Sequence, residues 1–277
     1  MNDQKVALIT GANSGIGRWT ATKLAKQGYR VFLACRSEEK ARPVVDEINA
    51  ANPGRAEFLP LDLADLNSVR ECARQFLALK LPLNLLVCNA GLAGSRGRTK
   101  QGFELTFGVC HVGHFLLTQL LLERIKAAAP ARIVVVASRG HLRASGIDFN
   151  AVRERTASKT GFPEYCVAKL ANVLFASELG RRLKGTGVTT YSLHPGVVAT
   201  DVWRTLPGPI ASIAKLFMRS EEDGASTSLF CATDPLAARE TGLYYVDEKP
   251  QETSKVAQDI GLAQRLWAET EQWVAAT

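Results

Sequence analysis

Three side chains in this 277-residue chain, Ser138, Tyr165 and Lys169, could together move a proton to or from an alcohol or carbonyl oxygen. Tyr165 and Lys169 are four residues apart in an expected helix, so they share one helix face. The ammonium group favours the phenolate, which would bring the pKa of Tyr165 from about 10 toward neutral pH. Ser138 follows an apolar stretch and could donate a hydrogen bond to an oxygen on which negative charge develops. These groups suit hydride transfer between a nicotinamide and a carbonyl or alcohol.

The beginning of the chain has the composition of a site for such a nucleotide. Residues 6–9 are apolar and read as a buried strand, and a helix is expected over 16–27. The glycines between them allow a tight turn, and amide groups at a helix N-terminus bind a pyrophosphate. Taken alone, the glycines would also fit an ordinary strand-to-helix turn. The residues that we assign to cofactor binding here are Gly11, Asn13, Ser14, Gly15, Ile16 and Gly17.

Arg36, directly after an expected strand at 30–35, bears on which nicotinamide cofactor is bound. At this strand end of a dinucleotide-binding fold, a carboxylate binds the free 2′-hydroxyl of the ribose, whereas an arginine accommodates a 2′-phosphate. Neither position 35 nor position 36 is acidic. We therefore expect NADP(H) in preference to NAD(H), with Arg36 at the phosphate; a surface arginine at the start of a loop is the alternative.

Two further strand ends carry expected cofactor contacts. Asp62 could accept a hydrogen bond from the adenine amino group, or it could cap the helix that begins near residue 66. The small residues after the strand at 83–88 let the backbone pass beneath a flat ligand, and Asn89 can fix the geometry of that loop. The residues assigned at these ends are Asp62, Leu63, Asn89, Ala90 and Gly91.

Strands and helices alternate along the chain, which predicts one doubly wound α/β domain over residues 1–277. The sheet is expected to have about seven parallel strands with helices on both faces, and ligands at the carboxyl ends of the strands. The expected strands are 6–9, 30–35, 57–61, 83–88, 132–137, 189–193 and 243–246, and the expected helices lie within 16–27, 38–51, 66–79, 102–129, 165–182, 222–233 and 257–274.

Several motifs, taken in order, resemble the short-chain dehydrogenase/reductase family. They are Thr10-Gly11-x-x-x-Gly15-Ile16-Gly17, Asn89-Ala90-Gly91, Ser138, Tyr165-x-x-x-Lys169 and Pro195-Gly196. Segments 113–118, 169–175 and 194–198 are similar to the retinol-dehydrogenase-like branch. The resemblance implies that Ser138 orients the substrate oxygen, that Tyr165 is the general acid/base, and that Lys169 assists Tyr165 and holds the nicotinamide ribose. It also implies cofactor contacts from Pro195, Gly196, Val198 and Thr200, and a homodimer or homotetramer built on the two long helices.

Cys110 departs from the family pattern, because it stands where the resemblance implies an active-site asparagine. In the family that residue helps to hold a water that links the lysine to solvent, partly through its backbone carbonyl, which a cysteine retains. We therefore expect a weaker proton relay and not an inactive protein. The alternative is a cofactor-binding regulator or scaffold, and an anion-binding interaction protein is a third hypothesis.

The segment 201–222 contains apolar residues interrupted by Pro207-Gly208-Pro209 and does not belong to the expected sheet. It could close as a lid over an apolar substrate, or it could pack against a partner subunit. The substrate classes that we expect are retinoids, steroids, lipid aldehydes and polycyclic metabolites.

Composition limits the other function classes. The formal net charge is +7, but the basic residues are dispersed without interleaved aromatic residues, so nucleic-acid binding is not expected. The six cysteines have no metal or redox spacing, which suits free thiols in a reducing compartment. His111 and His114 could share a metal by spacing, but no third ligand is evident, so we expect packing or hydrogen bonding and no metal site.

The beginning of the chain and its hydropathy bear on location. The first strand is expected near residue five, which leaves no room for a signal peptide, and no apolar run of about 18 residues is evident. We therefore expect a cytoplasmic protein without a membrane span.

Overall fold

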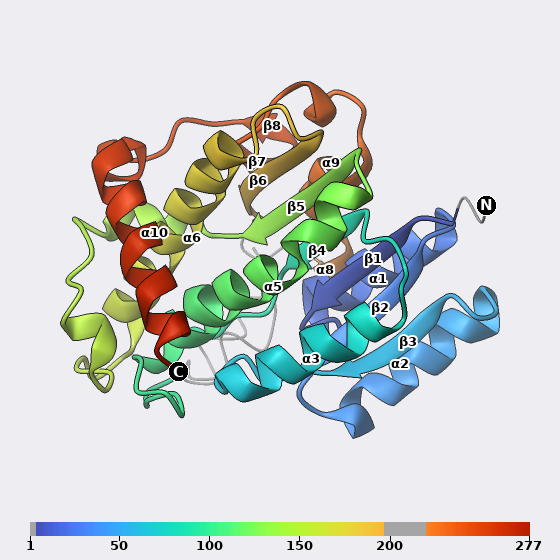
Figure 1. Cartoon of the computed structure of the whole chain (residues 1–277), viewed down its shortest axis with the longest axis horizontal. Coiled ribbons are helices and arrows are strands. Elements are labelled where there is room, and N and C mark those ends of the chain that lie inside the picture. Colours follow the sequence, from blue (N-terminus) through green and yellow to red (C-terminus); the bar gives the residue numbers. More distant parts are fainter. Residues whose placement is uncertain (1–3, 197–219) are drawn as a thin grey trace.

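A mostly parallel sheet runs through the middle of the computed structural model, which describes residues 4–196 and 220–277 (Figure 1). Within these residues the sheet has eight strands in the order β3-β2-β1-β4-β5-β6-β7-β8. The strands are β1 (Val6–Thr10), β2 (Arg30–Cys35), β3 (Ala56–Pro60), β4 (Leu85–Cys88), β5 (Ala131–Val136), β6 (Val188–His194), β7 (Leu243–Val246) and β8 (Lys249–Pro250). From β1 the chain adds β2 and β3 on one side, and from β4 it adds the later strands on the other side. Sheets of this kind bind ligands beside the two central strands, where the strand order reverses.

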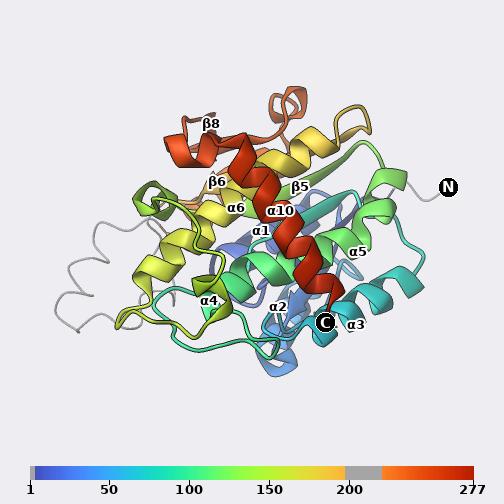
Figure 2. The ribbon, with the colours of Figure 1, turned by 60° about the vertical axis from the view of Figure 1, so that its left-hand side comes forward.

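Helices cover both faces of the sheet. One face carries α1 (Gly15–Lys26), α2 (Glu38–Ala51) and α9 (Ser226–Thr233), and the other carries α3 (Leu66–Ala78), α5 (Gly113–Ala127) and α6 (Phe162–Arg182). The last helix, α10 (Ile260–Ala275), lies on the outer side of α6 and reaches α5 (Figures 1 and 2). The predicted doubly wound fold is therefore confirmed.

The eighth strand was not predicted, and its turn explains why. β8 has two residues and pairs antiparallel with β7, with Tyr245 opposite Pro250. The two turn residues, Asp247 and Glu248, have φ angles of 51° and 63°. A hairpin turn of this kind usually contains Asn-Gly or Asp-Gly, so an Asp-Glu pair gives no recognisable sequence signal.

Two predicted helices are not regular α-helices over their whole length. The segment 102–129 contains α4 (Leu105–Phe107), a π-helical turn η1 (Gly108–Val112) and α5. The predicted helix 222–233 corresponds to two helices, α8 (Glu221–Gly224) and α9, which are separated at Ala225. A π-helical turn inside a helix often accompanies a functional site, and η1 contains Cys110.

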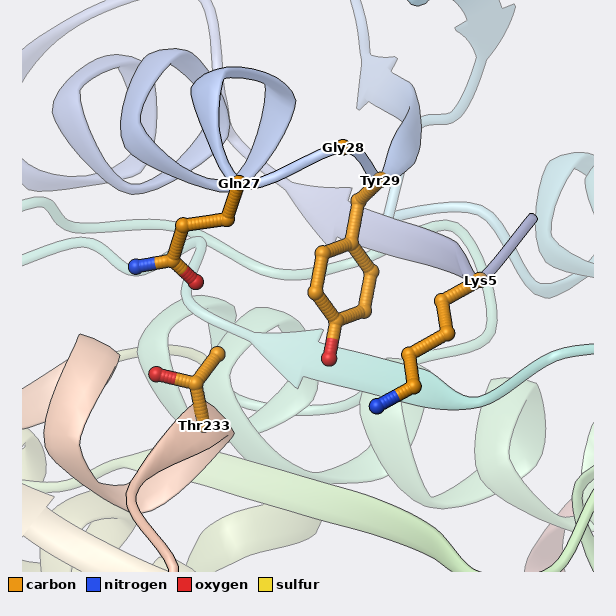
Figure 3. Close-up of a pocket in the computed structure, with 5 residues that line it drawn as sticks. All are labelled: Lys5, Gln27, Gly28, Tyr29 and Thr233. Atoms are coloured by element: carbon orange, nitrogen blue, oxygen red, sulfur yellow. The ribbon is translucent and has the colours of Figure 1, made fainter. Parts of the chain in front are cut away.

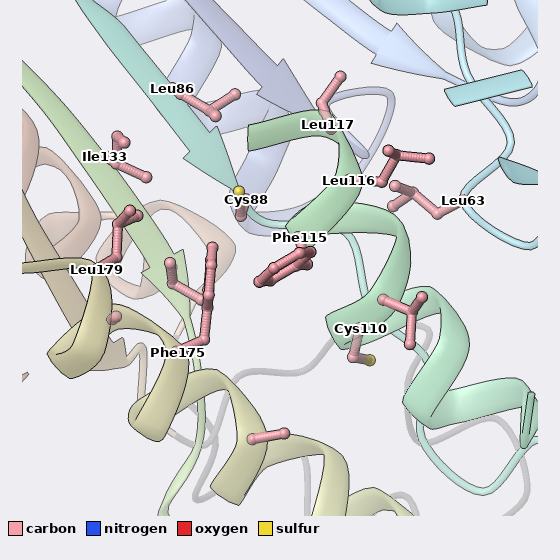
Figure 4. Close-up of a cluster of buried hydrophobic side chains, with 14 of the residues drawn as sticks. Leu63, Leu86, Cys88, Cys110, Phe115, Leu116, Leu117, Ile133, Phe175 and Leu179 are labelled. Atoms are coloured by element: carbon pink, nitrogen blue, oxygen red, sulfur yellow. The ribbon is translucent and has the colours of Figure 1, made fainter. Parts of the chain in front are cut away.

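The larger core cluster lies between the sheet and the face formed by α3, α5 and α6 (Figure 4). Phe115 of α5 is fully buried, and its ring centroid lies 5.6 Å from that of Phe175 and 4.9 Å from that of Trp267. These contacts join α5, α6 and α10. Aromatic pairs at such distances stabilise a core beyond the area that they bury.

The expectation that no apolar stretch is long enough to span a bilayer is wrong, because one helical segment has the length and the composition to do so. Within the described residues, the continuous helical segment Leu105–Ala127 has 23 residues and is apolar enough to do so. Most of it is buried inside the domain. The apolar composition is therefore explained by packing between the sheet and α10.

Replacing Phe115 with alanine tests this packing. We expect Phe115→Ala to lower the free energy of unfolding by about 3–5 kcal/mol, because a large buried ring is lost and a cavity remains. Leu120→Ala, at a more exposed position on the same helix, is the control and should cost about 0.5 kcal/mol or less. Urea unfolding measures both, and equal losses would contradict the placement of α5.

Candidate active site

The glycine loop after β1 has the conformation that a nucleotide-binding turn needs. Gly11 and Gly15 have φ angles of 65° and 57°, in the left-handed region that side chains disfavour. A Cβ atom on Gly17 would lie 2.5 Å from both the Asn89 side-chain nitrogen and the Gly11 carbonyl oxygen. The loop therefore packs directly against the residues that follow β4, and only glycine fits at position 17.

Thr10 holds the two loops together and was not among the predicted site residues. Its hydroxyl oxygen accepts hydrogen bonds from the backbone N–H groups of Asn89 and Ala90, each at 2.9 Å. The Asn89 side-chain amide donates to the Thr10 carbonyl at 2.8 Å, so Asn89 fixes the loop geometry as predicted. The Thr10 hydroxyl also lies 2.8 Å from Nε2 of His114 on α5. The Thr10-Gly11 motif was the only sequence signal for this role.

The N-terminus of α1 is open to an anion. Ser14 is the exposed N-cap residue, and its hydroxyl caps no backbone group of the helix. The first turn of α1 contains no acidic residue, and Asn13 is partly exposed beside it. Helix N–H groups without partners and a positive dipole end favour a bound phosphate. This cradle therefore fits the pyrophosphate of a dinucleotide.

Arg36 directly follows β2, the strand that pairs with β1. The Gly11 N–H donates to the Ala34 carbonyl at 2.9 Å, which joins the glycine loop to the end of β2. Arg36 is exposed and makes no hydrogen bond or ion pair with any described residue. Among the described residues, nothing therefore competes with an anion for its guanidinium group.

Asp62 and Leu63 lie just after the carboxyl end of β3, on the same side of the sheet as the glycine loop and Arg36. The Asp62 carboxylate accepts a hydrogen bond from the Ala64 N–H at 3.0 Å, and α3 is capped instead by Asp65, which accepts from the Asn67 N–H. The alternative in which Asp62 caps the helix is therefore wrong. Leu63 is buried, so its side chain belongs to the core.

Ser138, Tyr165 and Lys169 come together beyond β5. A Cβ atom on Gly140 would lie 3.0 Å from Cε1 of Tyr165 and 3.5 Å from Oγ of Ser138, so both side chains border this one position. Nζ of Lys169 lies 5.7 Å from the centroid of the Tyr165 ring. Lys169 is buried and donates a hydrogen bond to the Val136 carbonyl at 2.8 Å. The spacing that suggested one helix face therefore places the phenol beside the ammonium group.

Cys110 lies next to this group. A Cβ atom on Gly91 would be 3.4 Å from Nζ of Lys169 and 3.5 Å from Sγ of Cys110, so the thiol and the ammonium group border the same loop. The Cys110 carbonyl lies 3.0 Å from Nδ1 of His114. The residue thus directs its side chain toward Gly91 and its carbonyl toward α5.

The remaining predicted contacts follow β6. Pro195 and Gly196 come directly after this strand, at the edge that carries the other site residues, and Gly196 has a φ angle of 89°. Val198, Thr200 and residues 201–219 of the predicted lid lie outside the described residues. Ser220 caps α8 by accepting a hydrogen bond from the Asp223 N–H.

The two histidines and the cysteines behave as core residues. His111 contacts the Thr270 hydroxyl at 3.1 Å through Nε2, and His114 contacts Thr10 and Cys110. Both rings are packed in the core and hydrogen-bonded, as predicted, and Nδ1 of His111 is buried without a hydrogen-bond partner among the described residues. All six cysteines are free and buried.

Comparison with known proteins identifies the family. The profile described as short chain dehydrogenase matches residues 5–208. The chain belongs to the short-chain dehydrogenase family. Mouse retinol dehydrogenase 11 is 42% identical to this family member over 95% of the chain and 84% of the relative, and human retinol dehydrogenase 12 is 43% identical over the same shares. This short-chain dehydrogenase is thus of the retinol-dehydrogenase-like kind, as its motifs predicted.

Solved structures agree with this assignment. A crystal structure of a putative uncharacterized protein from Mycobacterium paratuberculosis has a TM-score of 0.78 and 32% identity, and covers 98% of this short-chain dehydrogenase and 94% of the other chain. A 3-ketoacyl-(acyl-carrier-protein) reductase from Brucella melitensis complexed with NADH has a TM-score of 0.68 at 24% identity, over 87% and 95% of the two chains, and shows the shared fold alone. The family fold implies a nicotinamide cofactor, which the glycine cradle and the open α1 terminus fit.

A surface cavity of about 370 Å³ lies near the amino ends of β1 and β2, opposite the strand ends that carry the candidate site (Figure 3). It is lined by Lys5, Gln27, Gly28, Tyr29 and Thr233. Lys5 precedes β1, whereas the predicted cofactor residues follow the strands, so this cavity is separate from the candidate active site.

The pH dependence of stability tests the burial of His114. Burial lowers its pKa to about 4, whereas an unfolded chain has a value near 6.5. The unfolded state therefore binds a proton first as the pH falls, so this stabilisation is complete above about pH 6.5 and is lost progressively toward about pH 4. Between about pH 7 and pH 5 we expect the loss in wild type to exceed that in His114→Gln by about 2 kcal/mol. Urea unfolding at each pH measures this difference, and parallel pH curves would contradict the assigned burial.

Proposed function

We propose that this protein is an NADP(H)-dependent dehydrogenase or reductase that acts on an apolar carbonyl or alcohol. The convergence of Ser138, Tyr165 and Lys169 beside the Asn89–Gly91 loop carries the proposal. The substrate would be a retinoid, a steroid, a lipid aldehyde or a polycyclic metabolite. The identity to retinol dehydrogenases supports this apolar class.

Each side chain has a role that follows from its position. The bound nicotinamide supplies or accepts the hydride. Tyr165 gives a proton to the substrate oxygen during reduction and removes it during oxidation. Ser138 donates a hydrogen bond to the same oxygen, and Lys169, whose Nζ lies 5.7 Å from the centroid of the Tyr165 ring, assists Tyr165 and holds the ribose.

Arg36 supports the choice of NADP(H). A 2′-phosphate bound at the end of β2 would meet an exposed guanidinium group that has no competing partner among the described residues. Arginine binds phosphate with two parallel hydrogen bonds, which a free 2′-hydroxyl cannot match.

The cofactor-binding regulator is the second candidate, and the observation in its favour is Cys110 beside Lys169. Relatives named as dehydrogenases do not favour it. Absorbance loss of NADPH or NADH with apolar aldehydes, ketones and quinones separates the two, with Cys110→Asn assayed in parallel. Turnover by wild type supports the enzyme, whereas turnover by Cys110→Asn alone supports a disabled reductase.

Three further features belong to the proposal. Residues 201–222 would act as a lid or contact a partner, and the protein would be cytoplasmic. A homodimer or homotetramer would be built on α5 and α6. Because α10 already packs on these two helices, such an interface would have to include α10.

Tyr165→Phe tests the acid/base role. Only the ionisable oxygen is removed, so we expect kcat to fall by about 100-fold or more while the Kd for NADPH stays unchanged. Tyr29→Phe removes the hydroxyl of a tyrosine that precedes β2, at the amino ends of the strands and away from the candidate site, and is the matched control. Stopped-flow absorbance and NADPH fluorescence provide the two readings, and full turnover by Tyr165→Phe would exclude this residue as the acid/base.

Arg36→Asp tests the cofactor choice. Loss of a charged hydrogen-bonded pair should weaken NADPH binding by roughly 10- to 100-fold while NADH binding changes little. Lys26→Asp makes the same charge change at the far end of α1 and should affect neither cofactor. Fluorescence titration gives both Kd values, and equal losses for NADPH and NADH would mean that Arg36 does not read the phosphate.

A further inference from the structure

His141 lies in the short helical turn η2 (Arg139–Arg143), three residues after Ser138, and is fully buried. Its backbone N–H donates to the Ser138 carbonyl at 3.1 Å, and its ring Nδ1 lies 2.7 Å from the same oxygen. The Gly140 N–H donates to the Ser138 hydroxyl oxygen at 3.1 Å. The backbone and the side chain of Ser138 are therefore both held by residues of η2.

The contact with the carbonyl fixes the tautomer of His141. A carbonyl oxygen only accepts hydrogen bonds, so Nδ1 must carry the hydrogen. Burial lowers the pKa of His141, which keeps the ring neutral and leaves Nε2 as an acceptor. Nε2 is buried and has no hydrogen-bond partner within the described residues.

Tyr244 of β7 supplies the complementary group. Its ring packs edge to face against the His141 ring, with centroids 4.8 Å apart. Its hydroxyl is also buried without a hydrogen-bond partner in the part of the chain that is described, and burial raises its pKa, so the phenol keeps its proton. A donor and an acceptor, both unsatisfied within the described residues, thus occupy the adjacent rings of Tyr244 and His141, where a buried water could join them.

We infer that His141 is a positioning residue that aims the Ser138 hydroxyl at the substrate oxygen, and that Tyr244 favours the tautomer this requires. The inference rests on the proposed function of Ser138. The hydroxyl accepts from Gly140, so its own hydrogen remains free to donate to the substrate. Where that hydrogen points depends on the backbone of residues 138–140, and His141 holds this backbone from the protein interior.

The competing explanation is that His141 only fills space between η2 and β7. A space-filling ring would lower stability when replaced, but its effect on turnover would not depend on whether Ser138 has a hydroxyl. A positioning ring affects turnover only through that hydroxyl. Residues that act as a unit give strongly non-additive effects, so a double-mutant cycle distinguishes the two explanations.

The test is the cycle of His141→Phe and Ser138→Ala, measured as single-turnover rates with saturating NADPH. We expect His141→Phe to lower the rate roughly 10-fold when Ser138 is present and less than about 2-fold in the Ser138→Ala background, with the Kd for NADPH unchanged. Equal losses in both backgrounds, or no loss in either, overturn the inference. Absence of turnover by wild type would instead count against the proposed function.

Two conservative variants cover the case in which His141→Phe does not fold. The amide nitrogen of Asn at position 141 can take the place of Nδ1, whereas that of Gln takes the place of Nε2. We expect His141→Asn to keep a rate within about 3-fold of wild type and His141→Gln to lose roughly 10-fold. Equal rates for the two variants overturn the inference.

The tautomer can be read without any substrate. Nitrogen-15 NMR of the His141 ring in wild type should show a hydrogen on Nδ1 and none on Nε2. The opposite tautomer overturns the inference whatever the turnover of the protein. Tyr244→Phe should increase the share of the Nε2–H form, and an unchanged tautomer in this variant removes Tyr244 from the proposal.

Discussion

The hydroxyl of Thr10 is the interaction on which the rest of the candidate site depends. A hydroxyl has two acceptor positions and one hydrogen. The backbone N–H groups of Asn89 and Ala90 use the acceptor positions, which leaves the hydrogen for Nε2 of His114 at 2.8 Å or for the more distant Val87 carbonyl at 3.4 Å. The carbonyl of Cys110 requires a hydrogen on Nδ1 of His114, which leaves Nε2 free to accept. One buried hydroxyl therefore joins the end of β1, the loop after β4 and the start of α5, and each of its bonds agrees with the others.

This arrangement explains why buried histidines are tolerated in an apolar core. His114 is neutral because burial disfavours its charged form, and both ring nitrogens have partners. A neutral, fully paired ring costs little in a core, whereas an unpaired polar group would cost about 1–3 kcal/mol. The same logic applies on the other side of the site, where His141 pairs with the Ser138 carbonyl but keeps one nitrogen unsatisfied. His111 also has one buried ring nitrogen without a partner among the described residues, so what distinguishes His141 as a positioning group is its contact with the backbone of Ser138.

Sequence alone predicted the parts of the fold that depend on local pattern. β2 and α2 have the expected bounds, because an apolar run and a capped amphipathic segment identify them without reference to the rest of the chain. β8 could not be predicted because it has only two residues and its Asp247-Glu248 turn lacks the usual hairpin signal, whereas the π-helical turn η1 depends on what it packs against. In the site, the i, i+4 pair of Tyr165 and Lys169 was evident from spacing. The roles of Thr10 and His141 were not, because their partners lie on different elements or on the backbone.

The position of Cys110 shows how a substitution within a motif can leave its surroundings intact. The carbonyl of this residue contacts His114, whereas the thiol borders Gly91 and Lys169. A side-chain change at position 110 therefore leaves the backbone contact with His114, and through His114 the Thr10 hydrogen bonds, in place. What changes is the polarity of the space beside the Lys169 ammonium group, since a thiol donates and accepts hydrogen bonds more weakly than a carboxamide. Relative to the asparagine that the resemblance implies, Cys110 would therefore retain the framework of the site and alter the solvation of Lys169.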